Sequence, residues 1–157
     1  MLTATTSLHA QMAIKNSLTA DLTQIKNSDV EINAKAQNNF KKLFPQITNE
    51  RWEKLPDGYS VFFTQNSFEN FVLYSKRGNW LSTVLKYTEN KLPKNVREQI
   101  KSVYFDYTIT QVDEVDLPDK TVYLVHMHDK DAWKIVRVCD DEMDVFQAFE
   151  NSNKNQD

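Results

Sequence analysis

The chain has 157 residues, a net charge of −3 and a hydrophobic content of 40%, which suits one compact domain or two very small ones. Its acidic balance, without a run of lysine or arginine, excludes nucleic acid as a partner, because nothing would neutralise a phosphate backbone. No run of about eighteen apolar residues occurs in it, so we expect no transmembrane segment.

Residues 1–10 resemble the end of a secretory signal peptide. They are small and weakly apolar, and Ala10 stands before Gln11 as the last residue of a signal stands before the mature chain. The basic and strongly apolar parts of a signal are missing, so an ordinary leader is the alternative. We interpret the stretch as a signal-peptide remnant, which predicts a periplasmic or secreted protein.

We expect residues 11–29 to be a polar leader or a short helix. Their apolar residues recur at intervals of four, four and three, which places them on one face of a helix: Ile14, Leu18, Leu22 and Ile25. A second helix is predicted over 33–44, with Asn33 as its cap and Pro45 at its end.

From residue 59 the apolar period changes to two, which predicts strands over 59–64, 71–75 and 80–87. Gly58 and Gly78 are expected in tight turns between antiparallel strands. A further helix should open at Pro93, where a missing N–H costs nothing. Strands are then predicted over 105–115, 122–128, 133–139 and 143–149, and the polar tail 151–157 is expected to be disordered.

The two halves of this pattern match each other. Phe40 corresponds to Ile100 at an offset of 60, and the tripeptide Leu-Pro-Asp at 55–57 recurs at 117–119. Chance symmetry is the alternative to a true repeat. We predict an α+β fold of two tandem helix-plus-antiparallel-sheet units, with copies at about 33–91 and 92–149 and the helices packed on one face of a curved antiparallel sheet.

Several of these positions carry a family resemblance. The sequence resembles the PepSY-like, beta-lactamase-inhibitor-like proteins of Bacteroidetes over roughly residues 30–149, and we take 30–150 as one domain of that kind. The matching positions are Phe40, Leu43, Phe44, Pro45, Trp52, the run 58–63, Tyr74, the run 78–80, Leu92, Pro93, Val96 and Ile100.

The resemblance implies a secreted or periplasmic protein whose helices pack on a curved antiparallel sheet. The other face of the sheet would then be available to a partner, and the family offers no catalytic residues to carry over. The chain departs from the pattern in its last hairpin, where Asp140 and Asp141 stand in place of an expected glycine.

His126 and His128 lie two apart on a predicted strand and share a face, with Asp129 and Asp131 close behind them. A closed metal site needs three or four convergent ligands, so we interpret the two histidines as solvated strand-end residues and predict neither metal nor cofactor. The single cysteine, Cys139, is expected to be a small buried thiol. No nucleophile–base pair or phosphate-binding glycine loop is recognisable, which predicts that the chain is not an enzyme.

The aromatic residues are the one positive indication of function. If helices cover one sheet face, rings on the other would form a surface suited to protein or peptide. The candidates are Tyr59, Tyr74, Trp80, Tyr107, Tyr123 and Trp133, with core packing as the alternative for each. We predict an exported, non-catalytic module that binds a protein or peptide through the open sheet face; an inhibitor or propeptide-like regulator of an exported enzyme is the alternative.

Overall fold

The computed structural model describes residues 31–150. The signal remnant predicted at 1–10, the leader or helix at 11–29 and the tail at 151–157 lie outside the described residues. The described elements are α2 (Ala34–Leu43), β1 (Arg51–Leu55), β2 (Gly58–Gln65), β3 (Phe68–Ser75), β4 (Trp80–Tyr87), η1 (Glu89–Lys91), α3 (Lys94–Val103), β5 (Thr108–Asp116), β6 (Thr121–His128), β7 (Ala132–Cys139) and β8 (Glu142–Glu150).

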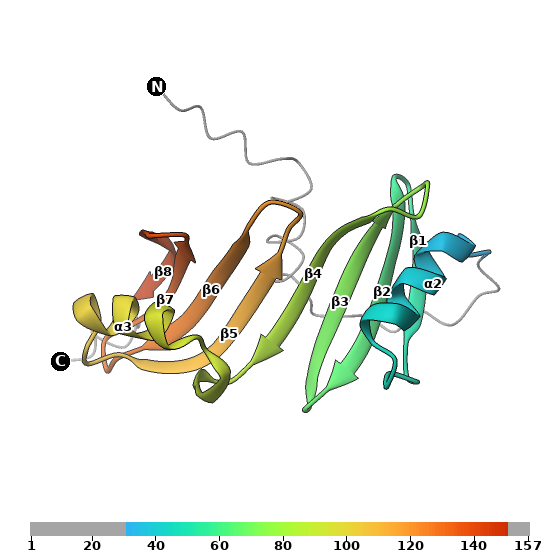
Figure 1. Cartoon of the computed structure of the whole chain (residues 1–157). Coiled ribbons are helices and arrows are strands. Elements are labelled where there is room, and N and C mark those ends of the chain that lie inside the picture. The colour runs from blue at the N-terminus through green and yellow to red at the C-terminus, as the bar shows by residue number, and fades with distance from the viewer. Residues whose placement is uncertain (1–30, 151–157) are drawn as a thin grey trace, which may run out of the picture. The chain divides into compact units, whose positions relative to one another are not determined.

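The strands form a single eight-stranded antiparallel sheet in chain order, from β1 to β8 (Figure 1). The predicted pair of tandem helix-plus-sheet units is therefore wrong. β4 and β5 are neighbours in the sheet. If the two units had separate sheets, both strands would be edge strands with unpaired backbone N–H and C=O groups, and pairing β4 with β5 satisfies those groups. The sequence indicates that the strands exist, but it does not show which partner β4 takes across a helix-containing connection.

By their internal contacts the residues divide into two compact units. Unit 1 comprises residues 31–85 with 115–118, and unit 2 comprises residues 86–114 with 119–150. Unit 1 therefore holds α2, β1 to β3 and most of β4, and unit 2 holds η1, α3, most of β5 and β6 to β8.

α2 packs on one face of the unit 1 strands (Figure 1). Asn33 caps it, because the Lys35 backbone N–H donates to Asn33 Oδ1 at 2.9 Å. Ala36 and Phe40, both fully buried, are the helix's contribution to the core. That core comprises Ala36, Phe40, Val61, Phe63, Val72 and Tyr74, with Phe44, Ile47, Trp52, Tyr59, Trp80 and Leu85 packed around it.

The first turn of α2 is held on the hairpin turn between β3 and β4. Asn33 Nδ2 donates to the Lys76 carbonyl oxygen at 3.4 Å. Gly78 in this turn has a φ of +75°, and a Cβ there would lie 2.4 Å from Asn33 Oδ1, so both the backbone conformation and the close approach call for glycine. The chain therefore enters α2 at the tip of the β3–β4 hairpin.

Gly58 differs from its predicted role, because it is the first residue of β2 rather than a turn residue. A Cβ at this position would lie 1.9 Å from the Tyr74 carbonyl oxygen on β3. Glycine is thus required here because two backbones approach closely.

The β7–β8 turn contains no glycine, although the family pattern led us to expect one. Asp140 takes its place with a φ of 53°, a region that aspartate tolerates better than most residues.

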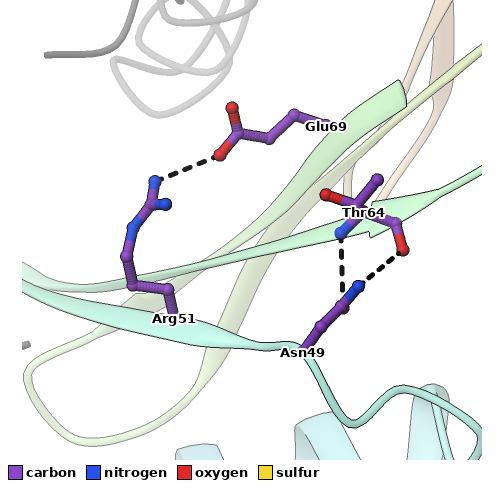
Figure 2. A network of polar contacts seen from close by, with 4 residues as sticks. All are labelled: Asn49, Arg51, Thr64 and Glu69. Atoms are coloured by element: carbon purple, nitrogen blue, oxygen red, sulfur yellow. Dashed lines mark hydrogen bonds and ion pairs between the residues drawn. The ribbon is translucent and has the colours of Figure 1, made fainter. Parts of the chain in front are cut away.

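β1, at the edge of the sheet, is absent from the strands predicted by sequence. Asn49 extends its pairing with β2 by one step: its side chain accepts from Thr64 N at 3.4 Å and donates to Thr64 O at 3.2 Å. Arg51 on β1 reaches Glu69 on β3 with 3.1 Å between Nη2 and Oε1 (Figure 2). Its guanidinium also lies 5.2 Å from the centre of the Phe62 ring, so this polar cluster ties β1 to β2 and β3.

α3 supplies the helix of unit 2. It follows Pro93 and ends at its cap residue Tyr104, as the missing N–H of proline and the apolar spacing predict. Val96 and Ile100 are 4% and 0% exposed, so one side of the helix is buried. On its outer side, Arg97 Nε lies 2.7 Å from Glu89 Oε1 and holds η1 against the start of α3.

Candidate partner-binding surface

The contacts of Lys134 on β7 show which face of the unit 2 strands lies on the α3 side. Its Nζ lies 2.9 Å from the Tyr107 hydroxyl oxygen and 5.0 Å from the centre of that ring. Tyr107 packs edge-on against Tyr104, the cap of α3. Lys134 therefore faces the α3 side, and Trp133, its neighbour on the strand, faces away from the helix because side chains alternate along a strand.

Three rings gather on the side away from α3. Trp133 pairs laterally with Phe149 on β8 and with His128 on β6. The His128 and Trp133 rings lie 4.5 Å apart with 31° between their planes, which is a stacked arrangement. Trp133 is 45% exposed and Phe149 is 53% exposed. We call His128, Trp133 and Phe149 the aromatic patch.

The turn that carries this patch is fixed by one carboxylate. Asp129 Oδ1 accepts from the backbone N–H groups of Asp131 and Ala132, each at 2.7 Å. The pKa of the Asp129 carboxyl is lowered, first by the hydrogen bond from Asp131 and then by the one from Ala132, against the opposing effect of desolvation. Asp129 N also donates to the Ala132 carbonyl at 3.1 Å. Trp133 therefore follows a closed turn, so little conformational entropy would be lost in ordering this turn when a partner binds.

Of the six aromatic residues predicted to bind a partner, Trp133 alone lies on a helix-free side. Tyr59 and Trp80 are half-buried against the core beneath α2, and Tyr74 is 1% exposed there, with its hydroxyl donating to Asn39 Oδ1 at 3.0 Å. Tyr107 contacts Lys134 on the α3 side, and Tyr123 shares the parity of Met127, which pairs with Lys134. A surface on the helix-free side therefore leaves out these five residues.

Sequence reasoning missed Phe149, and the reason is a bulge. From Cys139–Glu142 to Val136–Val145 the β7–β8 pairing is regular, but the next pair is Ile135–Gln147, so Phe146 is the extra residue. A regular hairpin would have placed Phe149 opposite Ala132, on the other face. Only the observed bulge brings Phe149 beside Trp133.

The two histidines considered as metal ligands have other contacts. His126 Nε2 lies 3.3 Å from Asp113 Oδ2, and the Asp113 side chain is fully buried and also accepts from Gln111 Nε2 at 2.6 Å. His128 stacks on Trp133. Over residues 31–150, no three histidine, cysteine, aspartate or glutamate side chains come together as metal ligands would.

The described residues hold two further candidate features, a cavity and a cysteine. Beside α2 in unit 1 lies an open cavity of about 450 Å³, bordered by Asn39, Trp80 and Asp116 among largely apolar neighbours; its lining holds no histidine, cysteine or second carboxylate. Cys139 is half-buried, and burial, followed by the charge of Asp140, raises the pKa of its thiol. A raised pKa reduces the fraction of nucleophilic thiolate, so neither feature forms a catalytic arrangement.

Comparison with known proteins gives a likeness at the level of fold. A DUF2874 family protein from Bacteroides uniformis superimposes with a TM-score of 0.59 at 17% identity, over 76% of this chain and 90% of that one. A BLIP-like protein from Bacteroides fragilis superimposes with a TM-score of 0.58 at 21% identity, over 82% of this chain and 92% of that one. The fold is that of BLIP-like Bacteroides proteins.

A third structure of this fold, a candidate periplasmic protein from Bacteroides eggerthii, has a TM-score of 0.59 at 16% identity and covers 77% of this chain and 90% of its own. No protein-family model matches the sequence, and no curated protein matches it either. The BLIP-like part of the predicted resemblance thus agrees with the fold, while the PepSY-like part stays a prediction. Within residues 31–150, no helix is long and apolar enough to cross a membrane.

Proposed function

We propose that this chain is an exported, non-catalytic binding module that engages a protein or peptide through the aromatic patch of unit 2. The observation that carries the proposal is the exposure of Trp133 and Phe149 as a cross-strand pair, 45% and 53% exposed, on the side away from α3. Tryptophan is among the residues that dominate binding energies at protein interfaces. Adjacent exposed rings of this kind are typical of an interaction site.

Support for export comes from the composition of residues 1–10 and from the BLIP-like fold, which is also that of a candidate periplasmic protein from Bacteroides eggerthii. Support for a binding role comes from rigidity as well as exposure. The Asp129 hydrogen bonds close the turn before Trp133, and the stack on His128 restricts the indole ring. A preordered patch loses less conformational entropy on association than a mobile one.

The test is affinity capture from periplasmic extract with the full chain as bait, followed by measurement of the dissociation constant for any protein recovered. Trp133→Ala is expected to weaken that binding by at least about 30-fold, the effect of losing a central aromatic anchor. Phe105→Ala is the matched control, because Phe105 is 79% exposed outside the patch. Equal losses for both variants, or a partner that binds Trp133→Ala as tightly as the parent, would overturn the proposal.

A second candidate is an inhibitor of an exported enzyme, and the observation that favours it is the BLIP-like protein among the similar structures. The same extract distinguishes the two. An inhibitor would lower the activity of a captured hydrolase in proportion to the amount of chain added, and Trp133→Ala would restore that activity. If a captured enzyme keeps its full activity, the inhibitor role is refuted and the role as a binding module remains.

A further inference from the structure

The helix-free side of unit 1 contains five residues that are almost inaccessible to solvent. Strand pairing places Ser60, Leu73 and Ser82 in one row and Phe71 with Val84 in the next. By alternation, both rows face away from the residues that pack under α2. Their exposures are 2%, 3% and 0% for the first row and 2% and 0% for the second. We call these five residues the covered patch.

Their burial is not explained by lateral neighbours on the strands. Phe62 and Arg51 lie in the same row as Phe71 and Val84, yet Phe62 is half-buried and the Arg51 side chain is 40% exposed. Solvent therefore reaches this side at Arg51 and Phe62 and is excluded from Ser60 on β2 and from the patch residues of β3 and β4. The one helix in the described part of unit 1, α2, packs on the opposite side.

Two orphaned hydroxyls indicate what kind of surface excludes the solvent. Ser60 Oγ and Ser82 Oγ are buried, and within residues 31–150 neither has a hydrogen-bond partner. A strand laid along the patch would bring unpaired backbone groups, and a polar peptide would bring side-chain donors. A helix brings neither on its apolar side, since its own backbone groups are already bonded to one another.

From these observations we infer that residues 11–28 dock on the covered patch as an amphipathic helix, with Ile14, Leu18, Leu22 and Ile25 against it. These are the apolar residues whose intervals of four, four and three place them on one helical face. From Ile14 to Ile25 a helix rises about 16 Å. Strands are spaced about 4.8 Å apart, so this length spans β2 to β4 with residues to spare.

The connection to α2 allows this placement. The chain enters α2 beside Lys76 and Gly78, at the tip of the β3–β4 hairpin, and β3 and β4 are the strands that carry Leu73 and Ser82. The eight steps from Ile25 to Asn33 can reach about 26 Å when extended. Two layers packed on opposite faces of a sheet lie about 20 Å apart at roughly 10 Å per layer, so the segment can pass round the hairpin tip from one side to the other.

The test uses a single thiol as a reporter in the full chain. With Cys139→Ser as background, Ser82→Cys places the thiol on the covered patch, and Thr83→Cys places it on the α2 side as a control. Leu18→Glu with Leu22→Glu alters the apolar face of the segment. Asn16→Glu with Thr23→Glu adds the same charge on the opposite face.

The Ser82→Cys thiol is expected to react slowly with a water-soluble disulfide reagent, and at least about tenfold faster once Leu18 and Leu22 are changed, since reaction then requires no local opening. The Asn16 and Thr23 changes should leave the rate low, and the Thr83→Cys thiol should stay slow throughout. Circular dichroism and thermal melting verify that each variant is folded.

Three results would overturn the inference. The first is a Ser82→Cys thiol that is reactive without any change in the segment. The second is one that stays protected after Leu18→Glu and Leu22→Glu. The third is protection that grows with protein concentration, together with dimers in sedimentation, because the occupant would then be a second copy of the chain.

Discussion

Tyr74→Phe separates a structural role for this tyrosine from the surface role suggested by sequence. Tyr74 is 1% exposed and donates its hydroxyl to Asn39. Removing such a bond costs about 0.5–1.5 kcal/mol at neutral pH. Burial also raises the pKa of the Tyr74 phenol well above its usual range, so the folded protein keeps the proton at pH values where the unfolded chain releases it.

The sign of the pH effect follows from that difference. Above about pH 10 the unfolded chain binds fewer protons than the folded one, so stability falls as pH rises. At pH 11 the wild type loses about 1.4 kcal/mol through this group, and Tyr74→Phe loses none. The deficit of the variant, about 1 kcal/mol at pH 7, should therefore shrink to near zero at pH 11.

Urea unfolding followed by tryptophan fluorescence at pH 7, 9 and 11 measures both proteins, and the titration of all other groups is common to the two. A variant whose deficit is the same at pH 11 as at pH 7 would refute the reasoning, because it would show that Tyr74 ionises as readily in the fold as in the unfolded chain.

Three further predictions concern packing and turns. Phe40→Ala, at a fully buried position, should lower the free energy of unfolding by about 3–5 kcal/mol in urea titrations, whereas Phe105→Ala, at 79% exposure, should stay within about 0.5 kcal/mol. Gly58→Ala should cost on the order of 3 kcal/mol or more, because its Cβ would meet the Tyr74 carbonyl oxygen at 1.9 Å; a melting temperature equal to the parent's would contradict that contact. Asp129→Ala should lower the protection factors of the backbone amides in the β6–β7 turn, that is, the ratios of their intrinsic exchange rates to the observed rates at the same pH. Acidification of the parent should lower these protection factors too, as pH falls through the lowered pKa of Asp129; unchanged protection factors would show that the turn does not depend on the carboxylate.

How far the sequence could predict the fold depended on how local each signal was. α2 was predicted over 33–44 and ends at Leu43, because its cap, its apolar stripe and Pro45 all act within a few residues. Strand positions after Gly58 were similarly legible from a period of two. The single sheet was not predicted, because the pairing of β4 with β5 joins strands separated by residues 88–107 and no local pattern encodes it.

The sequence predicted the candidate surface only in part, for a related reason. A period of two shows which residues share a face, but it does not show which face a helix covers. Lys134 settles that question in unit 2 through its contact with Tyr107, which is a contact between residues far apart in sequence. The sequence therefore named Trp133 as a candidate without assigning its face, and the bulge at Phe146 hid Phe149.

The distribution of exposure on the helix-free side of unit 2 supports the proposal that the aromatic patch acts as a discrete site. Leu124 and Ile135 lie on the same side as Trp133 and are 0% and 8% exposed, whereas Trp133 and Phe149 are about half exposed. Had exposure simply followed from the lack of a helix, all four would be open to solvent. Of these four side chains the two rings at the hairpin end are open, together with most of the edge strand β8, and Asp129 fixes that end. The proposed contact with a partner is therefore centred on the β6–β7 turn and the end of β8.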